Sequence, residues 1–369
     1  MRRKEGFTLL HTLAVSDFRN LTRVRLERLS RHNVIFGKNG SGKTSLLEAA
    51  HILGTARSFR GGKARSQVQY GKEGYVIHGV GTHSPMGVQR GVKGEVLLRV
   101  GGETVRSASR LADELPLLVI NSASFELLLG EPAQRRRLMD WGVFHVEHAE
   151  REVFPRFQRA LTQRNHLLRR GSIDPVEMEV WTSDLAAQGN SLAEARGRFV
   201  SALQAAFLPI LTGLAPELDG VTLSYRRGWD ANATYVEVLK RSTNTDLDQG
   251  FTHAGPQRAD IRVLVNGYPA AETLSRGQQK LLIIALKLAQ GHLVATAGVP
   301  VLFLIDDLPS ELDEERCEKV CRRLADMRAQ TLITCIDPES VPVPWLSAAG
   351  DSVDLFHVEH GNVSRTIAD

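Results

Sequence analysis

The chain has 369 residues, of which 42% are hydrophobic, and its net charge is +4. This length suits two or three domains, and the hydrophobic content is enough for substantial cores. No run of about eighteen uncharged apolar residues is present, and the basic N-terminus lacks the apolar core of a signal peptide. Three cysteines are too few for a disulfide framework and, without a second close pair, do not indicate a zinc site. Together these features predict a cytoplasmic protein with buried, reduced thiols and no membrane partner.

Positive charge is concentrated at the start of the chain, because residues 1–72 contain 15 Lys and Arg but only 4 Asp and Glu. Such a segment can attract polyanions. It can equally be a solvated surface that other parts of the fold neutralise, and composition does not separate the two. The run Arg135-Arg136-Arg137 opens a predicted helix, so at least one of these arginines is expected to face an acidic neighbour instead.

Strand patterns dominate the first 120 residues. Two strands are expected around a polar turn at 16–21, and two more are expected at 75–80 and 94–100, with Gly101-Gly102 as a hairpin signal. The glycine-rich stretch 79–94 is predicted to be a long loop between them.

Helical patterns begin near residue 121. Segments 132–170 and 176–213 carry apolar residues at helical spacing, and the turn signal between them predicts an antiparallel helical pair. Strand patterns return from Val221, with Asn266-Gly267 as a turn. We therefore divide the chain into a first part at 1–120, a helical insertion at 121–220 and a last part at 221–369.

Residues 37–44 have the spacing of a phosphate-binding loop, G-x-x-x-x-G-K-T, between an apolar run and a helix-compatible run. Backbone N–H groups of such a loop, together with the helix N-terminus behind it, bind phosphate oxygens. Lys43 is predicted to contact the β- and γ-phosphates, and Thr44 to bind Mg²⁺. The predicted ATP-binding residues are Gly37, Lys38, Asn39, Gly40, Ser41, Gly42, Lys43 and Thr44.

The apolar run 301–305 is followed by Asp306-Asp307. Such a run is typical of a strand buried in a parallel sheet, and carboxylates at its end lie where these sheets bind ligands. Asp306 is predicted to hold Mg²⁺, and Asp307 to orient or deprotonate the attacking water as a catalytic residue beside Lys43. Lys43 and Asp306 are 263 positions apart, which indicates that the helical segment interrupts the nucleotide-binding domain.

A third motif, Ser275-Arg276-Gly277-Gln278, precedes a strongly apolar helical run. Ser275 is predicted to cap this helix. Its side chain, the Gly277 backbone and the helix N-terminus would form a second anion-binding site, although a plain capped core helix has the same pattern.

This third motif resembles the signature of ABC-type ATPases, and Ser310 and Asp313 resemble their D-loop. In those proteins the signature of one subunit closes over the ATP held by the other. The order of the loop, the insertion, the signature and the Asp-Asp pair resembles the SMC-like branch. With the segments 17–21, 56–60, 135–141 and 255–260, the resemblance extends to the bacterial RecF family over nearly the whole chain.

The resemblance implies an α/β fold, namely a split ABC/SMC-type P-loop ATPase head with an inserted short helical arm. It also implies a DNA replication and repair protein with ATP and Mg²⁺ as cofactors. Such a protein binds single- and double-stranded DNA, forms an ATP-dependent homodimer and helps to load recombinase at gaps with RecR and RecO. The candidate DNA-binding residues, which could contact nucleotide instead, are Arg57, Arg60, Lys63 and Arg65.

Several positions depart from the wider ABC pattern. Asp307 stands where Glu is usual, and Arg276 where Gly is common. No switch histidine follows the strand pattern at 331–335, and Asn121 or Ser122 replaces the usual Q-loop glutamine. In addition, Gln257 stands where the RecF family commonly has His. These departures predict a weak, DNA-stimulated ATPase whose slow hydrolysis acts as a timer.

Two other functions stay open at this stage. One is an SMC-like ATPase with a nuclease-associated function, and the other is a transporter ATPase subunit. No appended metal-dependent nuclease constellation is visible, and the insertion and the basic N-terminal segment argue against a transporter. The pentapeptide Phe-His-Val-Glu-His occurs at 144–148 and at 356–360. Its spacing is not that of H-E-x-x-H and the two contexts differ, so we interpret the repeat as coincidence.

Overall fold

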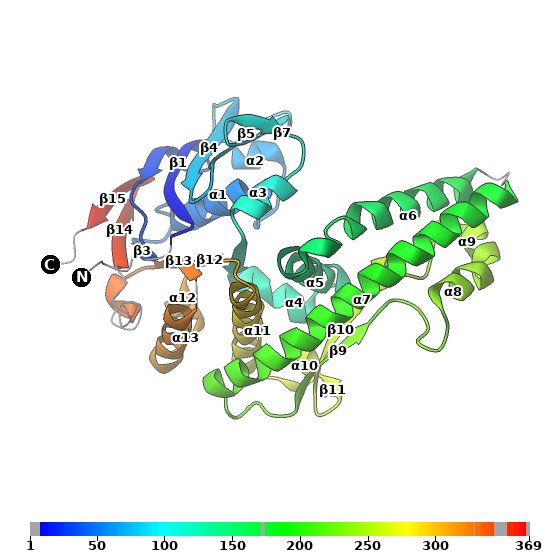
Figure 1. Cartoon of the computed structure of the whole chain (residues 1–369). Coiled ribbons are helices and arrows are strands. Elements are labelled where there is room, and N and C mark those ends of the chain that lie inside the picture. The colour runs from blue at the N-terminus through cyan, green and yellow to red at the C-terminus, as the bar shows by residue number, and fades with distance from the viewer. Residues whose placement is uncertain (1–7, 171–173, 328, 343–352, 367–369) are drawn as a thin grey trace. The chain divides into compact units, whose positions relative to one another are not determined.

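The computed structural model describes residues 8–170, 174–327, 329–342 and 353–366 (Figure 1). The chain forms two compact units. The first, called the head unit here, combines residues 1–124 with 294–369, and the second, the arm unit, comprises residues 125–293. Residues 221–293 are thus compact with the helical segment, whereas the sequence grouped 221–369 with the head. The functional division into 1–120, 121–220 and 221–369 stays a prediction.

A six-stranded, mostly parallel sheet forms one layer of the head unit, in the order β15-β14-β3-β13-β12-β8. Every pair in it is parallel except β14 and β15. All five residues of β12 are buried, as predicted for a central parallel strand. The strands are β3 (His32–Phe36), β8 (Leu117–Ile120), β12 (Val301–Ile305), β13 (Ala329–Cys335), β14 (Val353–Glu359) and β15 (Asn362–Thr366).

The second sheet of the head unit is antiparallel, in the order β2-β1-β4-β5-β6-β7. The predicted loop at 79–94 is wrong, because β4 and β5 form a hairpin there. The glycines that suggested a loop serve packing: a Cβ at Gly79 would lie 2.3 Å from Leu53 Cδ2, so glycine lets a helix approach the sheet. The strands are β1 (Leu10–Phe18), β2 (Leu21–Leu26), β4 (Gly74–Gly81), β5 (Pro85–Gly91), β6 (Val96–Val100) and β7 (Glu103–Val105).

Helix α1 (Lys43–Thr55) contributes buried residues to a core that it shares with strands of both sheets. The three cysteines are buried and free, as predicted. Burial raises the pKa of Cys317 to about 11 and that of Cys335 to about 12, so both thiols stay protonated at neutral pH. The other helices of this unit are α2 (Ala64–Gln67), α3 (Ser109–Glu114), α12 (Leu308–Glu311), α13 (Glu314–Asp326) and the 3₁₀ turns η1 (Ser122–Phe125, which ends in the arm unit) and η4 (Pro338–Ser340).

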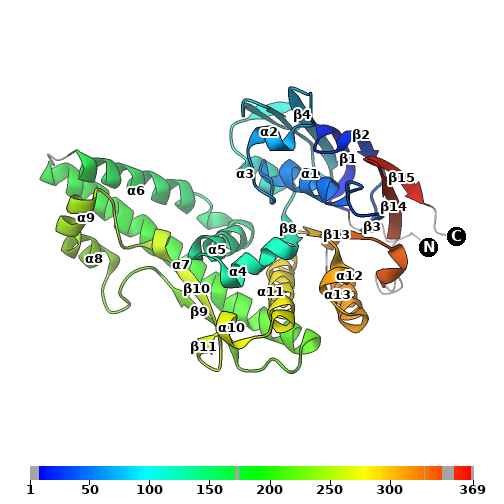
Figure 2. The same ribbon diagram turned by 180° about the vertical axis from the view of Figure 1, so that it is seen from behind.

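Two long antiparallel helices, α6 and α7, lie side by side in the arm unit (Figure 2). The predicted pair is therefore present, although its first segment is divided between α5 and α6. Asp174 caps α7 by accepting a hydrogen bond from the Val176 N–H. The helices are α4 (Glu126–Leu129), α5 (Pro132–Val146), η2 (His148–Glu150), α6 (Val153–Arg169), α7 (Pro175–Leu214), α8 (Tyr235–Arg241), α9 (Thr243–Gln249), η3 (Pro256–Arg258), α10 (Ala270–Thr273) and α11 (Arg276–Thr296), which ends in the head unit.

A small antiparallel sheet completes the arm unit, in the order β11-β10-β9. The predicted turn at Asn266-Gly267 is confirmed, since both residues have positive φ between β10 and β11. The strands are β9 (Val221–Arg226), β10 (Asp260–Val265) and β11 (Tyr268–Pro269).

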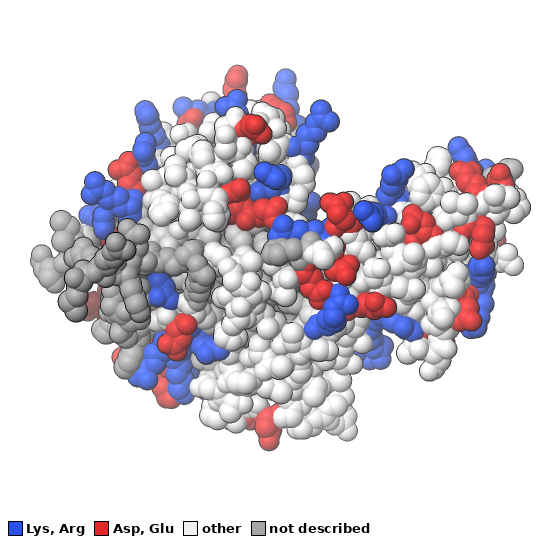
Figure 3. All heavy atoms as spheres, viewed as in Figure 1, with Lys and Arg blue, Asp and Glu red and all other residues white. Residues whose placement is uncertain are grey.

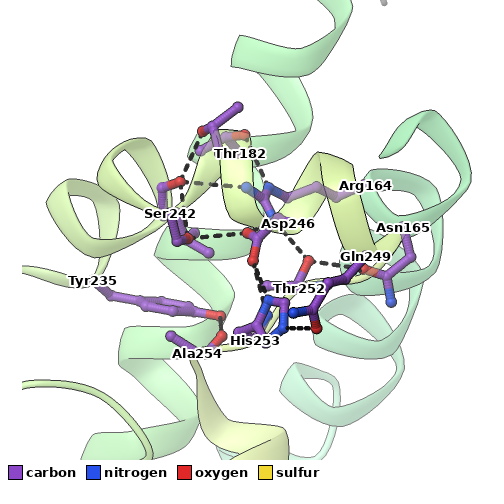
Figure 4. A network of polar contacts seen from close by, with 12 residues as sticks. Arg164, Asn165, Thr182, Tyr235, Ser242, Asp246, Gln249, Thr252, His253 and Ala254 are labelled. Atoms are coloured by element: carbon purple, nitrogen blue, oxygen red, sulfur yellow. Dashed lines mark hydrogen bonds and ion pairs between the residues drawn. The ribbon is translucent and has the colours of Figure 1, made fainter. Parts of the chain in front are cut away.

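A buried polar network ties α6, α7 and α9 together (Figure 4). The Arg164 guanidinium donates to Asp246 at 2.8 Å and to Thr252 at 2.6 Å, and both members of the ion pair have fully buried side chains. His253 Nδ1 lies 2.7 Å from the same carboxylate. Removing one partner of such a pair would leave an uncompensated buried charge, so the network fixes how these helices meet.

Judged by length and apolar composition alone, α7 could cross a membrane. Among the described residues it is the only helix that meets both criteria. Its residues Leu185, Ala186 and Leu192 belong to a hydrophobic cluster with residues of α6 and α8. Of the apolar window that meets the membrane criterion, 39% is buried inside the structure.

Candidate nucleotide site

The phosphate-binding loop lies between β3 and α1, as the motif requires. Gly37 has φ 147° and Gly42, the N-cap of α1, has φ 122°, a region that favours glycine. A Cβ at Gly37 would lie 2.2 Å from the Val358 carbonyl oxygen, and one at Gly42 would lie 2.9 Å from Leu21 Cδ2. Glycine is therefore required at both positions by backbone conformation and by space.

The Lys43 side chain folds back over this loop and is buried. Its ammonium donates to the Gly37 carbonyl at 2.7 Å and to the Lys38 carbonyl at 3.2 Å. Within the described part of the chain it forms no ion pair with a carboxylate. A buried ammonium held only by neutral carbonyls is suited to accept an anionic partner.

Thr44 and Asp306 are brought together although they lie far apart in the sequence. The Thr44 hydroxyl donates to Asp306 Oδ1 at 3.0 Å, and the Thr334 hydroxyl donates to the same oxygen at 2.8 Å. Thr334 Oγ1 also accepts from the Asp307 N–H at 2.8 Å. Thr334, at the end of β13, thus orients both predicted acidic residues, a role that the sequence pattern did not indicate.

A cavity of about 810 Å³ opens over these residues and is lined by both acids. Asp307 has a left-handed backbone, with φ 56° and ψ 51°, and this non-glycine conformation is strained. Asn121 and Ser122, the predicted substitutes for the Q-loop glutamine, also line the cavity, as does Ser310. The Ser310 hydroxyl donates to the Asp307 carbonyl at 2.9 Å.

Asp313, the second predicted D-loop residue, caps α13. It accepts a hydrogen bond from the Arg316 N–H at 2.9 Å, and its other oxygen pairs with the Arg316 guanidinium at 2.8 Å. These bonds, the backbone bond first, lower the pKa of Asp313. The described contacts of Asp313 are therefore those of a helix cap.

Glu48 is a functional candidate that the sequence did not single out. It is fully buried on α1 and accepts two hydrogen bonds from the Arg19 guanidinium, at 2.7 and 3.1 Å. The Ser58 hydroxyl donates to it at 2.5 Å, and Arg60 lies 3.6 Å away. Arg19 also donates to the Ser66 carbonyl at 2.6 Å. Glu48 and Arg19 thus fasten the basic segment 57–66 to the helix that follows the phosphate loop.

The four candidate DNA-binding residues, Arg57, Arg60, Lys63 and Arg65, are exposed on this segment. Arg60 also lines the nucleotide cavity, so the alternative of a nucleotide contact stays open for it. Figure 3 shows Lys and Arg spread over the visible face with Asp and Glu among them. Such a distribution matches diffuse phosphate contacts better than one dense patch.

The signature segment lies at the start of α11 in the arm unit. The Ser275 hydroxyl accepts from the Gln278 N–H at 3.4 Å, and the Gln278 side chain accepts from the Ser275 N–H at 3.0 Å. This reciprocal pair confirms Ser275 as the helix cap. Ser275, Arg276 and Gly277 are exposed, and no atom within 4 Å would meet a Cβ at Gly277.

The residues at the loop fit a magnesium nucleotide. The Ser41 hydroxyl is buried without a partner, and the Lys43 ammonium faces only carbonyls. Thr44 and Asp306 offer a hydroxyl and a carboxylate oxygen 3.0 Å apart, which are the oxygen ligands that Mg²⁺ takes beside phosphates. Among the described residues there is no group of three or more His, Cys, Asp or Glu placed to hold a metal without such a ligand.

The repeated pentapeptide adopts two different structures, as its contexts predicted. The first copy runs from α5 into η2, and the second runs along β14 and past its end.

The arginine run on α5 is engaged within the arm unit. Arg135 forms a bidentate pair with Asp260, at 2.7 and 3.2 Å, which confirms the expectation of an acidic neighbour. Arg136 donates to the Ala259 carbonyl at 3.0 Å. The two motifs at 135–141 and 255–260 therefore meet in space.

Comparison with known proteins agrees with this geometry. The family model described as the RecF/RecN/SMC N terminal domain matches residues 9–343. The DNA replication and repair proteins RecF of Pseudomonas aeruginosa (strain LESB58) and of Azotobacter vinelandii are each 45% identical to the chain, over 363 and 362 residues. Each match covers 97% of this chain and 98% of the relative.

Two solved structures establish the fold. The recombination mediator protein RecF with ATP, from the RecFOR pathway, covers 100% of both chains with a TM-score of 0.83 at 23% identity. An Smc head bound to the C-winged helix domain of ScpA covers 97% of each chain with a TM-score of 0.59 at 13% identity. The predicted fold class, an SMC-type P-loop ATPase head split by a helical arm, is confirmed. The family match and the two relatives together show that the chain belongs to the RecF family of DNA replication and repair proteins.

Proposed function

We propose that the chain is an ATP-switched DNA-binding protein that dimerises on ATP and acts at single-strand gaps in replication and recombinational repair. The observation that carries the proposal is the head-unit cavity, in which Lys43, Thr44, Asp306 and Asp307 converge. A RecF structure of the same fold contains ATP, which supports ATP as the ligand here.

Each of these residues has a defined task in the proposed site. Lys43 exchanges its two carbonyl partners for phosphate oxygens, and the loop N–H groups bind the same phosphates. Thr44 and Asp306 hold Mg²⁺, which when bound neutralises charge on the β- and γ-phosphates. Asp307 orients the attacking water. Its side chain is one methylene shorter than the usual Glu, which favours slow hydrolysis that resets the switch.

The separation of the two proposed anion-binding elements supports dimerisation. The loop belongs to the head unit, and the exposed Ser275 turn belongs to the arm unit. In the proposed dimer, the Ser275 turn of one copy closes over the nucleotide held by the other.

The DNA partner and the protein partners are proposed from the family. We place single- and double-stranded DNA on the exposed basic segment 57–65, since its side chains suit phosphates and no base-reading motif is evident. RecR and RecO are the expected protein partners for recombinase loading, and the expected location is the cytoplasm.

Gel filtration with ATP and gapped DNA tests this function. The wild type is expected to elute as a dimer on DNA only when ATP is present, and the complex should weaken steeply with salt. Elution as a monomer in every condition, or DNA binding that is flat between low and physiological salt, would contradict the proposal.

A further inference from the structure

A second cleft, of about 920 Å³, lies entirely within the arm unit. Its lining comes from α5, α7, the end of β9 with the loop that follows, and the segment from η3 into β10. The charged residues of the lining are four arginines and two acids, Arg226, Arg227, Arg258, Arg262, Glu194 and Asp260. None of them belongs to the nucleotide site or to the basic segment 57–65.

Positive charge is in excess in this cleft. Asp260 is already bound bidentately by Arg135. Arg226, Arg258 and Arg262 are exposed, and none of them forms an ion pair among the described residues. Burial and then the positive charge of Arg196 lower the pKa of Arg136, whereas Asp260 and Asp140 act in the opposite direction. The exposed Arg226, Arg258 and Arg262 would attract an anionic ligand.

The donors that a ligand in the cleft can reach are the exposed guanidinium groups of Arg226, Arg258 and Arg262. Arg227 donates instead to the Asp230 and Ala233 carbonyls, at 2.8 and 3.1 Å. Guanidinium groups pair with acceptor oxygens, so a ligand that suits this lining is rich in them.

The Trp229 ring of the cleft is already engaged by neighbouring side chains. Trp229 stacks on Tyr235 with ring centroids 4.5 Å apart, and the Arg227 guanidinium lies 4.7 Å from the centroid of the indole ring. Trp229 is therefore already stacked, and the exposed arginines offer contacts to a charged backbone.

The arginine-rich motifs hold the cleft in shape. Arg136 donates to the Ala259 carbonyl at 3.0 Å, and Arg196 donates to the Pro256 carbonyl at 2.7 Å. These bonds fix the backbone on both sides of Arg258. The motif at 255–260 thus contributes Arg258 and Asp260 to the lining, and Arg136 of the motif at 135–141 bonds the backbone between them.

We propose that this cleft binds the sugar–phosphate backbone of a single nucleic-acid strand, independently of its sequence. The proposal rests on the proposed DNA binding and adds a second contact region to it. The guanidinium groups of arginines can each donate two hydrogen bonds to phosphate oxygens, and such contacts do not depend on the identity of the bases. The cleft, of about 920 Å³, lies in the size range of sites for small ligands, about 300–1,000 Å³, which suits a short stretch of one strand better than a duplex. An acidic peptide is the alternative occupant, which the test below distinguishes from DNA.

The test measures binding of the full chain to fluorescein-labelled oligodeoxythymidylate by anisotropy over a range of salt concentrations. Arg226→Glu/Arg262→Glu is expected to weaken binding about tenfold at low salt and to reduce the salt slope by about 1.4, or 0.7 for each lost phosphate contact. The matched control is Arg156→Glu/Arg159→Glu, which makes the same charge change at exposed arginines of α6 and should bind nearly as the wild type does. If the charge reversals unfold the arm unit, Arg226→Gln/Arg262→Gln tests the same slope.

Each outcome separates this proposal from the wider function. Equal loss in the cleft and control variants would overturn the cleft site, because the effect would then be one of net charge alone. Unchanged DNA binding in the cleft variant, with loss in Arg57→Glu/Arg60→Glu, would overturn the cleft and leave the proposed function standing. If the cleft substitutions abolish binding of poly-glutamate but leave DNA binding unchanged, the cleft would be assigned to an acidic protein. A wild type that binds no single strand at all would overturn both proposals.

Discussion

Helix α1 in the head unit and helix α11 in the arm unit both begin at a turn of small residues, yet the two turns are built differently. The turn before α1 is a packed loop. Gly37 and Gly42 have positive φ there, and the Lys43 side chain is buried within the loop. The turn before α11 is exposed, and its Ser275 hydroxyl is engaged by the helix that it caps.

The difference bears on which parts of the proposed nucleotide site one chain supplies by itself. The loop, Thr44 and Asp306 are held in place by contacts within the head unit, so the phosphate side is preorganised. The Ser275 turn is exposed on the arm unit, so its backbone is accessible to a ligand. This is the arrangement expected if the second half of the site comes from another copy.

The largest expected effect is on hydrolysis. Asp307→Asn should lower the single-turnover ATPase rate by about 10²–10⁴, because it removes the group that positions water, while Lys43, Thr44 and Asp306 keep the nucleotide bound. If hydrolysis is the reset, the variant should also stay on DNA longer. Asp326→Asn, at an exposed position on α13, is the control. Normal hydrolysis in Asp307→Asn would remove this residue from catalysis, and slow hydrolysis with wild-type release from DNA would contradict the timer.

The next effect is on nucleotide affinity. Lys43→Ala should weaken ATP binding by about 100-fold, since hydrogen bonds to a charged group are worth about 1.5–3 kcal/mol and this ammonium is buried at the phosphates. Lys93→Ala, at an exposed position between β5 and β6, should change affinity little. Titration with a fluorescent ATP measures both variants. Equal affinities for wild type and Lys43→Ala would place the nucleotide elsewhere.

Glu48→Gln tests whether the buried contacts of Glu48 with Arg19 contribute to the stability of the head unit. Removing this buried charge from its contacts with Arg19 should lower the free energy of unfolding by about 2 kcal/mol. Arg60→Gln is the control, because the Arg60 side chain is 47% exposed and its 3.6 Å contact should contribute less than about 0.5 kcal/mol. Denaturant unfolding compares the two, and an equal effect would argue against Glu48 as the organising residue.

The smallest effect is expected at the signature turn. Ser275→Ala removes only a helix cap, which is typically worth about 1 kcal/mol. It should lower the stability of the arm unit by that amount in denaturant unfolding and leave ATP binding in the head unit unchanged. A loss of ATP affinity by the isolated monomer would mean that Ser275 acts on nucleotide within its own chain.

The parts of the site that follow one another in the chain were predictable from sequence. The loop at 37–44, the buried strand before Asp306 and the cap at Ser275 are each encoded within about ten residues, so motif and periodicity were sufficient. Contacts between distant segments were not predictable in this way. Thr334 bonds Asp306 from a neighbouring strand, and nothing in its local sequence marks it.

Glycines caused the main error in the fold. Those of the stretch 79–94 were read as a loop because glycine usually breaks strands. In the structure Gly79 makes room for Leu53 of α1, so the choice of residue reflects packing against a helix encoded elsewhere. The Glu48–Arg19 pair was missed for the same reason, since its partners lie 29 positions apart and no local pattern pairs them.

Sedimentation of Ser275→Arg with ATP tests the central claim most directly, because the claim is that the two phosphate-binding turns meet between copies. The wild type should be a dimer with ATP and a monomer or weak dimer without it. Ser275→Arg should bind ATP as the wild type does yet remain monomeric, since the new side chain fills the space for the partner's γ-phosphate. Ser183→Arg, at an exposed serine of α7, should dimerise normally. An unchanged ATP-dependent dimer in Ser275→Arg would contradict the account.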